Sequence, residues 1–124
     1  MIRTFTGTSL QSIQPSSGYK WILLSALLVL TTGTGSGTRA LSLGITLNNA
    51  PGGYAVPITS TGDQTGTSTT YRTYLIGSGG SQNTSGQLTA LIEIDADTQL
   101  TIYGGLITGD TVVYSIQVDE VLDA

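Results

Sequence analysis

The stretch "GYKWILLSALLVLTT", residues Gly18–Thr32, decides the fold, because only here do apolar side chains follow one another without regular alternation. Within it, Ser25 is the one polar residue between Trp21 and Leu30. The run from Trp21 to Leu30 is ten residues long, whereas a helix that crosses a bilayer needs roughly 20 apolar residues, so a membrane span is not expected. A secretion signal would begin with a basic segment, whereas mostly polar, Thr- and Ser-rich residues precede this run.

A buried helix and a buried strand both fit a run this short, and the flanking glycines and strand-like neighbours favour the strand. A strand would place two apolar faces back to back. One face would carry Trp21, Leu23, Leu27 and Val29, and the other Ile22, Leu24, Ala26, Leu28 and Leu30. With one face in the core, we expect the second to be covered by a subunit interface or by the segment Met1–Ile13 folding back over it.

Composition narrows the class of protein. The chain of 124 residues is long enough for one domain, predicted as an N-terminal arm or edge strand at 1–16 and a β-sandwich domain at 17–124. It has no cysteine, so no disulfide holds it. Four basic and eight acidic residues give a net charge of −4, which argues against nucleic-acid binding. Only 10% of residues are charged, a composition common in extracellular and virion β-proteins.

The rest of the chain alternates between apolar and polar residues in short segments separated by turn residues, and no helical period lasts three turns. Thr38–Asn48 and Asp110–Leu122 alternate most regularly. Their core-facing residues are predicted to be Leu41, Leu43, Ile45 and Leu47, and Val112, Tyr114, Ile116 and Val118. Further strands are expected within Arg3–Ile13, Tyr54–Thr59, Thr67–Ile76, Leu88–Ile94 and Gln99–Tyr103. The predicted fold class is all-β, a single jelly-roll-like β-sandwich of about eight strands.

Residues for catalysis are nearly absent. Without histidine or cysteine there is no Ser-His-Asp or Cys-His nucleophile and no ordinary zinc site. Glu93, Asp95 and Asp97 could supply a carboxylate pair, but they share one face of a short segment and would not oppose each other across a substrate. The same acids, with Asp63, Asp110 or Asp119, would need converging loops to bind calcium. We predict a solvated acidic edge, and no catalytic residue, metal or cofactor.

Other motifs favour structural interpretations. Gly33–Gly37 lacks the lysine of a phosphate-binding loop and leads into a strand. Asn83-Thr84-Ser85 matches the glycosylation pattern, which has weak specificity. Six tyrosines, at 19, 54, 71, 74, 103 and 114, could stack on sugars but suit half-buried strands better. The four basic residues, Arg3, Lys20, Arg39 and Arg72, are scattered, and each is expected to have a carboxylate partner.

The order of several motifs resembles small β-sandwich proteins of tailed-phage structural modules. The matching positions are Trp21, Leu30-Thr31-Thr32, Arg39 with Leu41 and Leu43, Gly109-Asp110-Thr111 and Asp119-Glu120. The resemblance covers roughly Gly18–Leu47 and Thr101–Asp123. It implies a virion component on the capsid surface, either a capsid decoration (cement) protein or a head or tail fibre module, with no catalytic residues to carry over.

On this interpretation the chain is a homotrimer that bridges capsomers of a phage head. The predicted oligomer interface is Ile22, Leu24, Leu28 and Leu30, and the predicted contacts with the major capsid protein are Ile2, Arg3 and Phe5 on the N-terminal arm. Nucleic acid and membrane are not expected partners. The alternative is a carbohydrate- or receptor-binding module of a phage fibre or tail, with tyrosines and glycine-rich loops as its contact surface.

Overall fold

The computed structural model describes residues 1–47, 55–76, 86–87 and 92–123, and every regular element among them is a strand. The strands are β1 (Ile2–Gly7), β2 (Gln11–Ile13), β3 (Tyr19–Thr31), β4 (Ser42–Leu47), β5 (Ala55–Ser60), β6 (Thr70–Ile76), β7 (Gly86–Gln87), β8 (Glu93–Ile94), β9 (Thr98–Tyr103) and β10 (Thr111–Leu122). Within these residues no helix is long and apolar enough to cross a membrane.

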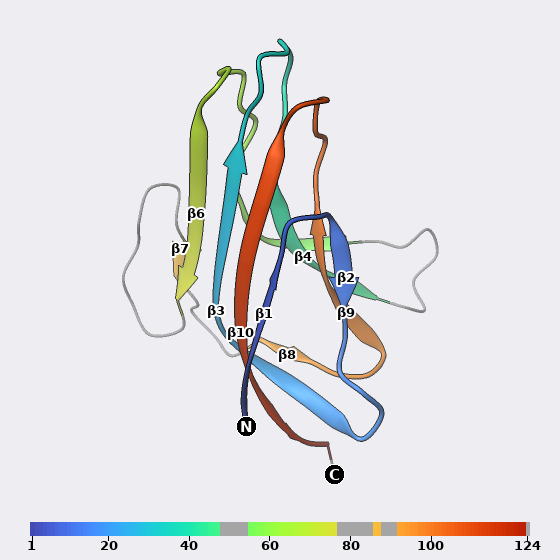
Figure 1. The fold of residues 1–124 in the computed structure, drawn as a ribbon. Helices are drawn as coiled ribbons and strands as arrows, with labels where there is room; N and C mark the ends of the chain where they lie inside the picture. Colours follow the sequence, from blue (N-terminus) through green and yellow to red (C-terminus); the bar gives the residue numbers. More distant parts are fainter. Residues whose placement is uncertain (48–54, 77–85, 88–91, 124) are drawn as a thin grey trace.

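The strands form two sheets packed face to face (Figure 1). One has the order β1-β10-β3-β6-β7, with the short β8 also beside β3, and the other has the order β2-β9-β4-β5. Apart from the two-residue strands β7 and β8, each strand of the first sheet has a chain neighbour at the same place in the second: β1 with β2, β10 with β9, β3 with β4 and β6 with β5. This order is that of a jelly roll, so the predicted all-β, jelly-roll-like sandwich is confirmed.

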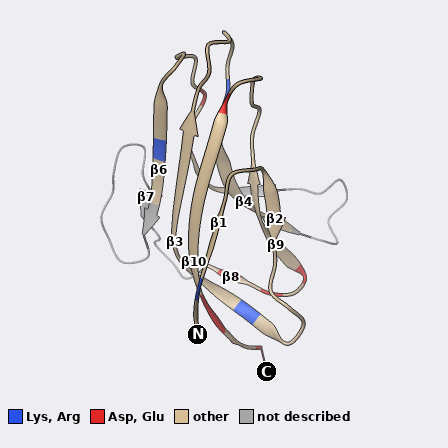
Figure 2. Ribbon diagram, viewed as in Figure 1, with Lys and Arg blue, Asp and Glu red and all other residues tan. Residues whose placement is uncertain are grey.

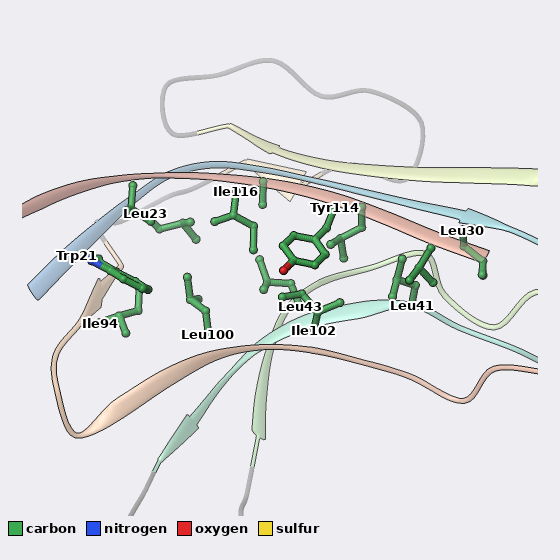
Figure 3. Packing of buried hydrophobic residues seen from close by; sticks show 14 residues of the cluster. Trp21, Leu23, Leu30, Leu41, Leu43, Ile94, Leu100, Ile102, Tyr114 and Ile116 are labelled. Carbon is green, nitrogen blue, oxygen red and sulfur yellow. The ribbon is translucent and has the colours of Figure 1, made fainter. Parts of the chain in front are cut away.

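The Trp21–Leu30 run is the centre of the larger sheet, as part of β3. It lies between β10 and β6, and its inward side chains form one wall of the core (Figure 3). The buried members are Trp21, Leu23, Ala26, Leu28 and Leu30. The short-helix alternative is therefore wrong, and the run is a strand.

The predicted division of this strand into two faces is wrong, because β3 contains a β-bulge. Ser25 pairs with Gln117 and Leu23 pairs with Val118, which leaves Leu24 without a partner on β10. The extra residue shifts the alternation by one, so the inward positions are odd before the bulge and even after it. Leu28 and Leu30 consequently face the same core as Trp21 and Leu23.

The predicted core positions of the other two alternating segments are confirmed where side chains are described. Val112, Tyr114, Ile116 and Val118 of β10 are 0–5% exposed. In the other sheet Leu43 is fully buried beside its partner Ile102. Leu41 is also fully buried, just ahead of β4, and Ile45 packs against the core from its edge.

Strand positions follow the sequence closely where residues are described, except at the amino terminus; residues 88–91 of the expected strand Leu88–Ile94 lie outside the described part of the chain. Where one strand was expected within Arg3–Ile13, the chain forms two, β1 in the larger sheet and β2 in the smaller. The segment 1–16 thus contributes edge strands to both sheets of the sandwich. Tyr54, the Asn49–Gly53 turn and the Asn83-Thr84-Ser85 pattern lie outside the described residues.

Candidate interaction surfaces

A buried ion pair joins the loops at the end of the sandwich opposite the two termini (Figure 1). The Arg39 and Asp110 side chains are both 0% exposed, and Nε of Arg39 lies 3.2 Å from Oδ2 of Asp110. Arg39 uses all five of its N–H groups, donating twice to Asp110 and once each to the carbonyls of Gly35, Gly37 and Gly66. The guanidinium thereby ties three loops together.

Asp110 is equally well satisfied. Besides Arg39, the backbone N–H groups of Gly33 and Ile107 donate to its carboxylate at 2.9 and 3.0 Å. The hydrogen bonds from Arg39 are the largest influence and lower the pKa of Asp110 to about 2 against the opposing effect of burial. Because donors and acceptors are all paired within the chain, this cluster offers no free group to a ligand and stabilises the loops instead.

A second polar cluster lies near the amino terminus, around Glu120. Its Oε2 accepts hydrogen bonds from Nε1 of Trp21 at 2.8 Å and from Nη1 of Arg3 at 2.9 Å. These two bonds, Trp21 first, lower the pKa of Glu120. The Met1 ammonium adds contacts to the Asp119 carboxylate and the Glu120 carbonyl. The first strand is thus held to the last by charge as well as by the backbone ladder.

The three residues predicted to contact a capsid lie on β1, and two of them serve the fold. Phe5 packs its ring 4.8 Å from that of Trp21, and Arg3 lies over the Phe5 ring at 4.9 Å while pairing with Glu120. Ile2 alone is directed outward, with 56% of its surface exposed. A detached arm carrying all three residues is therefore not what this chain forms, because Arg3 and Phe5 are committed to its own core edge.

The four residues predicted as an oligomer interface do not share a face. Leu28 and Leu30 are 0% exposed in the core, whereas Ile22 and Leu24 are half-buried on the outer face of the larger sheet. The bulge at Leu24 is the physical reason for this separation. The outer apolar residues form a row along the middle of the sheet, called here the outer β3 row: Ile22, Leu24, Leu27 and Val29.

The neighbours of the outer β3 row are mixed: on β6, Tyr74 pairs with Leu27 and Arg72 with Val29, and on β10 the neighbours of Leu27 and Val29 are uncharged. Val113 of β10, which pairs with Val29, is 49% exposed and extends the row sideways. Ser115 and Gln117 continue along the same side of β10. Each member of the row is half-buried in the single chain, so part of the cover expected from a partner already comes from the chain itself.

The acidic residues do not assemble a site. Asp95 accepts a hydrogen bond from the backbone of Asp97 and is linked to Thr98, which makes it part of a tight turn, and Glu93 lies 3.6 Å from Lys20. Asp110 belongs to the buried pair and Asp119 to the amino-terminal contacts. Among the described residues, no three acidic side chains are placed to hold a metal ion. The acidic positions lie at separate places along the ribbon in Figure 2.

Three of the described tyrosines, Tyr19, Tyr71 and Tyr114, lie apart from one another. Tyr114 is buried in the core, where its ring covers Gly7 and its hydroxyl accepts a hydrogen bond from Gln11. Tyr71 packs against the core edge, and Tyr19 is exposed near the opposite end of the sheet. No flat aromatic platform is formed by these three, so they give no support to a sugar-stacking surface.

Sequence reasoning anticipated carboxylate partners for the basic residues but did not identify them. Arg3 pairs with Glu120, Lys20 with Glu93 and Arg39 with Asp110. Trp21, Glu120, Arg39 and Asp110 were all among the motif positions of the resemblance. The sequence did not indicate that Trp21 contacts Glu120 or that Arg39 contacts Asp110. No family model, no curated protein and no solved structure matches this chain.

Proposed function

We propose that this chain is a non-enzymatic structural protein that self-associates through the outer β3 row and serves as a decoration protein on the outside of a phage capsid. The observation that carries the self-association is the placement of the row, Ile22, Leu24, Leu27 and Val29, at the centre of the larger sheet. Val113, 49% exposed, widens it. A central aliphatic patch with a polar margin is how protein–protein contacts are generally built.

The virion assignment rests on the resemblance to tailed-phage β-sandwich proteins. The residues that carry this resemblance make contacts that stabilise the fold. These motif residues make the buried Arg39–Asp110 pair and the Trp21–Glu120 contact, so they support a shared sandwich rather than a shared binding site. The chemistry agrees with a structural role, because the titratable groups of both clusters are committed to one another. A homotrimer would bridge neighbouring capsomers through many weak contacts that add by multivalency.

The first test is the solution mass of the purified 12.8 kDa chain by light scattering. The proposal expects a mass that is a multiple of three chains and that falls to one third in Leu27→Asp, because a carboxylate would be buried in the interface. Thr67→Asp is the matched control, since Thr67 is exposed in a loop away from the sheet face. A wild-type chain that stays monomeric at high concentration would contradict self-association.

The second test is binding to emptied heads of the phage that encodes the chain, followed by co-sedimentation. Wild type is expected to bind and Leu27→Asp to bind at least tenfold more weakly, because separate subunits lose the gain from multivalency. Equal binding by both variants would disconnect trimer formation from capsid decoration. Absence of the protein from purified virions would reject the capsid role altogether.

A further inference from the structure

The six-residue strand β1 forms one edge of the larger sheet, and apart from Arg3 its free side lacks the devices that normally keep edges from pairing. Its register with β10 is continuous from Ile2 to Gly7, with no bulge and no proline. Its one charged side chain, Arg3, is 41% exposed, but its charge is paired with Glu120. The outward side chains along the strand are Ile2, Thr4 and Thr6, all exposed and uncharged.

The edge strands β2, β5 and β7 each have a feature that limits pairing. β2 is three residues long and β7 is two, both too short to template a long ladder. β5 carries Pro57, which has no N–H to donate. β1 has none of these features, so it can accept a further strand over its full length.

The hydrogen bonds at the start of β1 show which of its backbone groups are free. Met1 donates to the Glu120 carbonyl at 2.8 Å and accepts from the Glu120 N–H at 2.8 Å, so the two form a hydrogen-bonded pair. In an antiparallel ladder such pairs alternate with pairs whose polar groups point the other way. Odd residues of β1 therefore bond to β10, and the even residues Ile2, Thr4 and Thr6 direct N–H and C=O groups to the free side.

We propose that β1 is a second self-association surface, on which two copies of this chain pair their β1 strands antiparallel about a two-fold axis. In the proposed register Thr4 lies opposite Thr4 of the second copy, and Ile2 lies opposite Thr6. Each of the three even residues of β1 then pairs with an even residue of the second copy. A two-residue shift toward the amino terminus would set Arg3 opposite Arg3, and a shift toward the carboxyl end would bring fewer residues together. Opposed β-branched residues are favourable cross-strand pairs.

A second copy is the occupant that these observations favour, because the free edge is complementary to itself. It carries no net charge that would call for an oppositely charged partner, and a two-fold pairing satisfies both edges at once. The inference goes beyond the proposed function, since the β1 edge and the outer β3 row are different parts of the larger sheet. A trimer paired through β1 would have twice the trimer mass.

Cysteine cross-linking tests the register directly, because the chain contains no cysteine of its own. Hydrogen-bonded partners have Cα atoms about 5.5 Å apart, within the range of about 4.4–6.8 Å that a disulfide requires. Thr4→Cys alone should form a linked dimer on mild oxidation. Ile2→Cys and Thr6→Cys should link when mixed but not separately, because like positions would lie about 13 Å apart.

A pair of substitutions at Thr4 tests the role of the backbone. Thr4→Pro removes only an N–H that points to the free side, so the fold is expected to remain while the mass halves. Thr4→Val keeps that N–H and should keep the mass. Because Phe5 packs on Trp21, the near-ultraviolet signal of Trp21 reports whether β1 stays docked. If Thr4→Pro undocks the strand, Thr4→Lys replaces it and should weaken association by setting like charges opposite each other.

The outcomes separate this inference from the proposed trimer. Leu27→Asp should abolish the trimer yet leave the Thr4→Cys cross-link, and Thr4→Pro should leave a trimer. Equal cross-linking at Ile2, Thr4 and Thr6, each tested alone, would overturn the register. No cross-link at any position, with Thr4→Pro and Thr4→Val of equal mass, would overturn β1 pairing.

Discussion

Arg39 donates two hydrogen bonds to Asp110 across a separation of 71 residues, and neither side chain is exposed to solvent. A buried ion pair of this kind is expensive to desolvate, and it persists here because the backbone satisfies every remaining donor and acceptor. The pair fixes the loops at one end of the sandwich in a single arrangement. Its energetics can be measured.

Replacing Asp110 by Asn should destabilise the chain by about 3–5 kcal/mol, because the Arg39 charge would remain buried without its counter-ion. The measurement is urea unfolding followed by Trp21 fluorescence. Asp119→Asn is the control, since that carboxylate is 37% exposed in a surface contact with Met1, and its loss should cost less than about 1 kcal/mol. Equal effects would mean that the buried pair contributes no more than a surface one.

Acid should weaken the fold in a defined range. The pKa of Asp110 is lowered from 3.8 to about 2, so between these values the unfolded chain binds more protons than the folded one. The stabilisation from Asp110 is complete above about pH 4 and is lost as pH falls toward about 2, and the lowered pKa of Glu120 acts in the same direction. Thermal unfolding across this range should show a shallower fall in Asp110→Asn than in wild type.

Deleting Leu24 should be tolerated, although the residue lies within the central strand. It has no partner on β10, and its removal would join Leu23 to Ser25 in unbroken alternation. Deleting Leu27 instead would move the core-facing side chains at one end of β3 to the outer face, because a one-residue shift exchanges the two faces of a strand. We expect the first variant to unfold cooperatively and the second to lack the near-ultraviolet signal of Trp21. A folded Leu27 deletion would show that β3 can re-register.

Two adjacent glycines provide a matched pair. A Cβ on Gly104 would lie 2.0 Å from the Ala40 carbonyl oxygen, whereas one on Gly105 would meet nothing within 4 Å. Gly104→Ala should therefore cost more than about 1 kcal/mol, and Gly105→Ala should change stability by less than about 1 kcal/mol. Comparison of their urea midpoints decides between this steric explanation and a general need for flexibility in the turn.

The fold class could be predicted because alternation and turn residues mark each strand locally, as at Val112, Tyr114, Ile116 and Val118. The assignment of residues to the two faces of β3 could not be predicted. A bulge depends on how two strands distant in sequence pair, and no local sequence signal marks Leu24 as the extra residue. The Arg39–Asp110 contact was also beyond reach, because a charge at one position does not indicate which of eight acids it meets. The predicted interface therefore combined core and surface residues.

The strand order has a consequence for how the protein is made. β10 lies between β1 and β3, so the first strand and the central strand both wait for the last strand before they are paired on that side. At about 5–20 residues per second, synthesis leaves Trp21–Leu30 without this neighbour for several seconds on the ribosome. During that interval an aliphatic segment with high β propensity is open to other nascent chains. Trp21–Leu30, which form the centre of the larger sheet in the folded protein, are thus the segment most exposed to aggregation during synthesis.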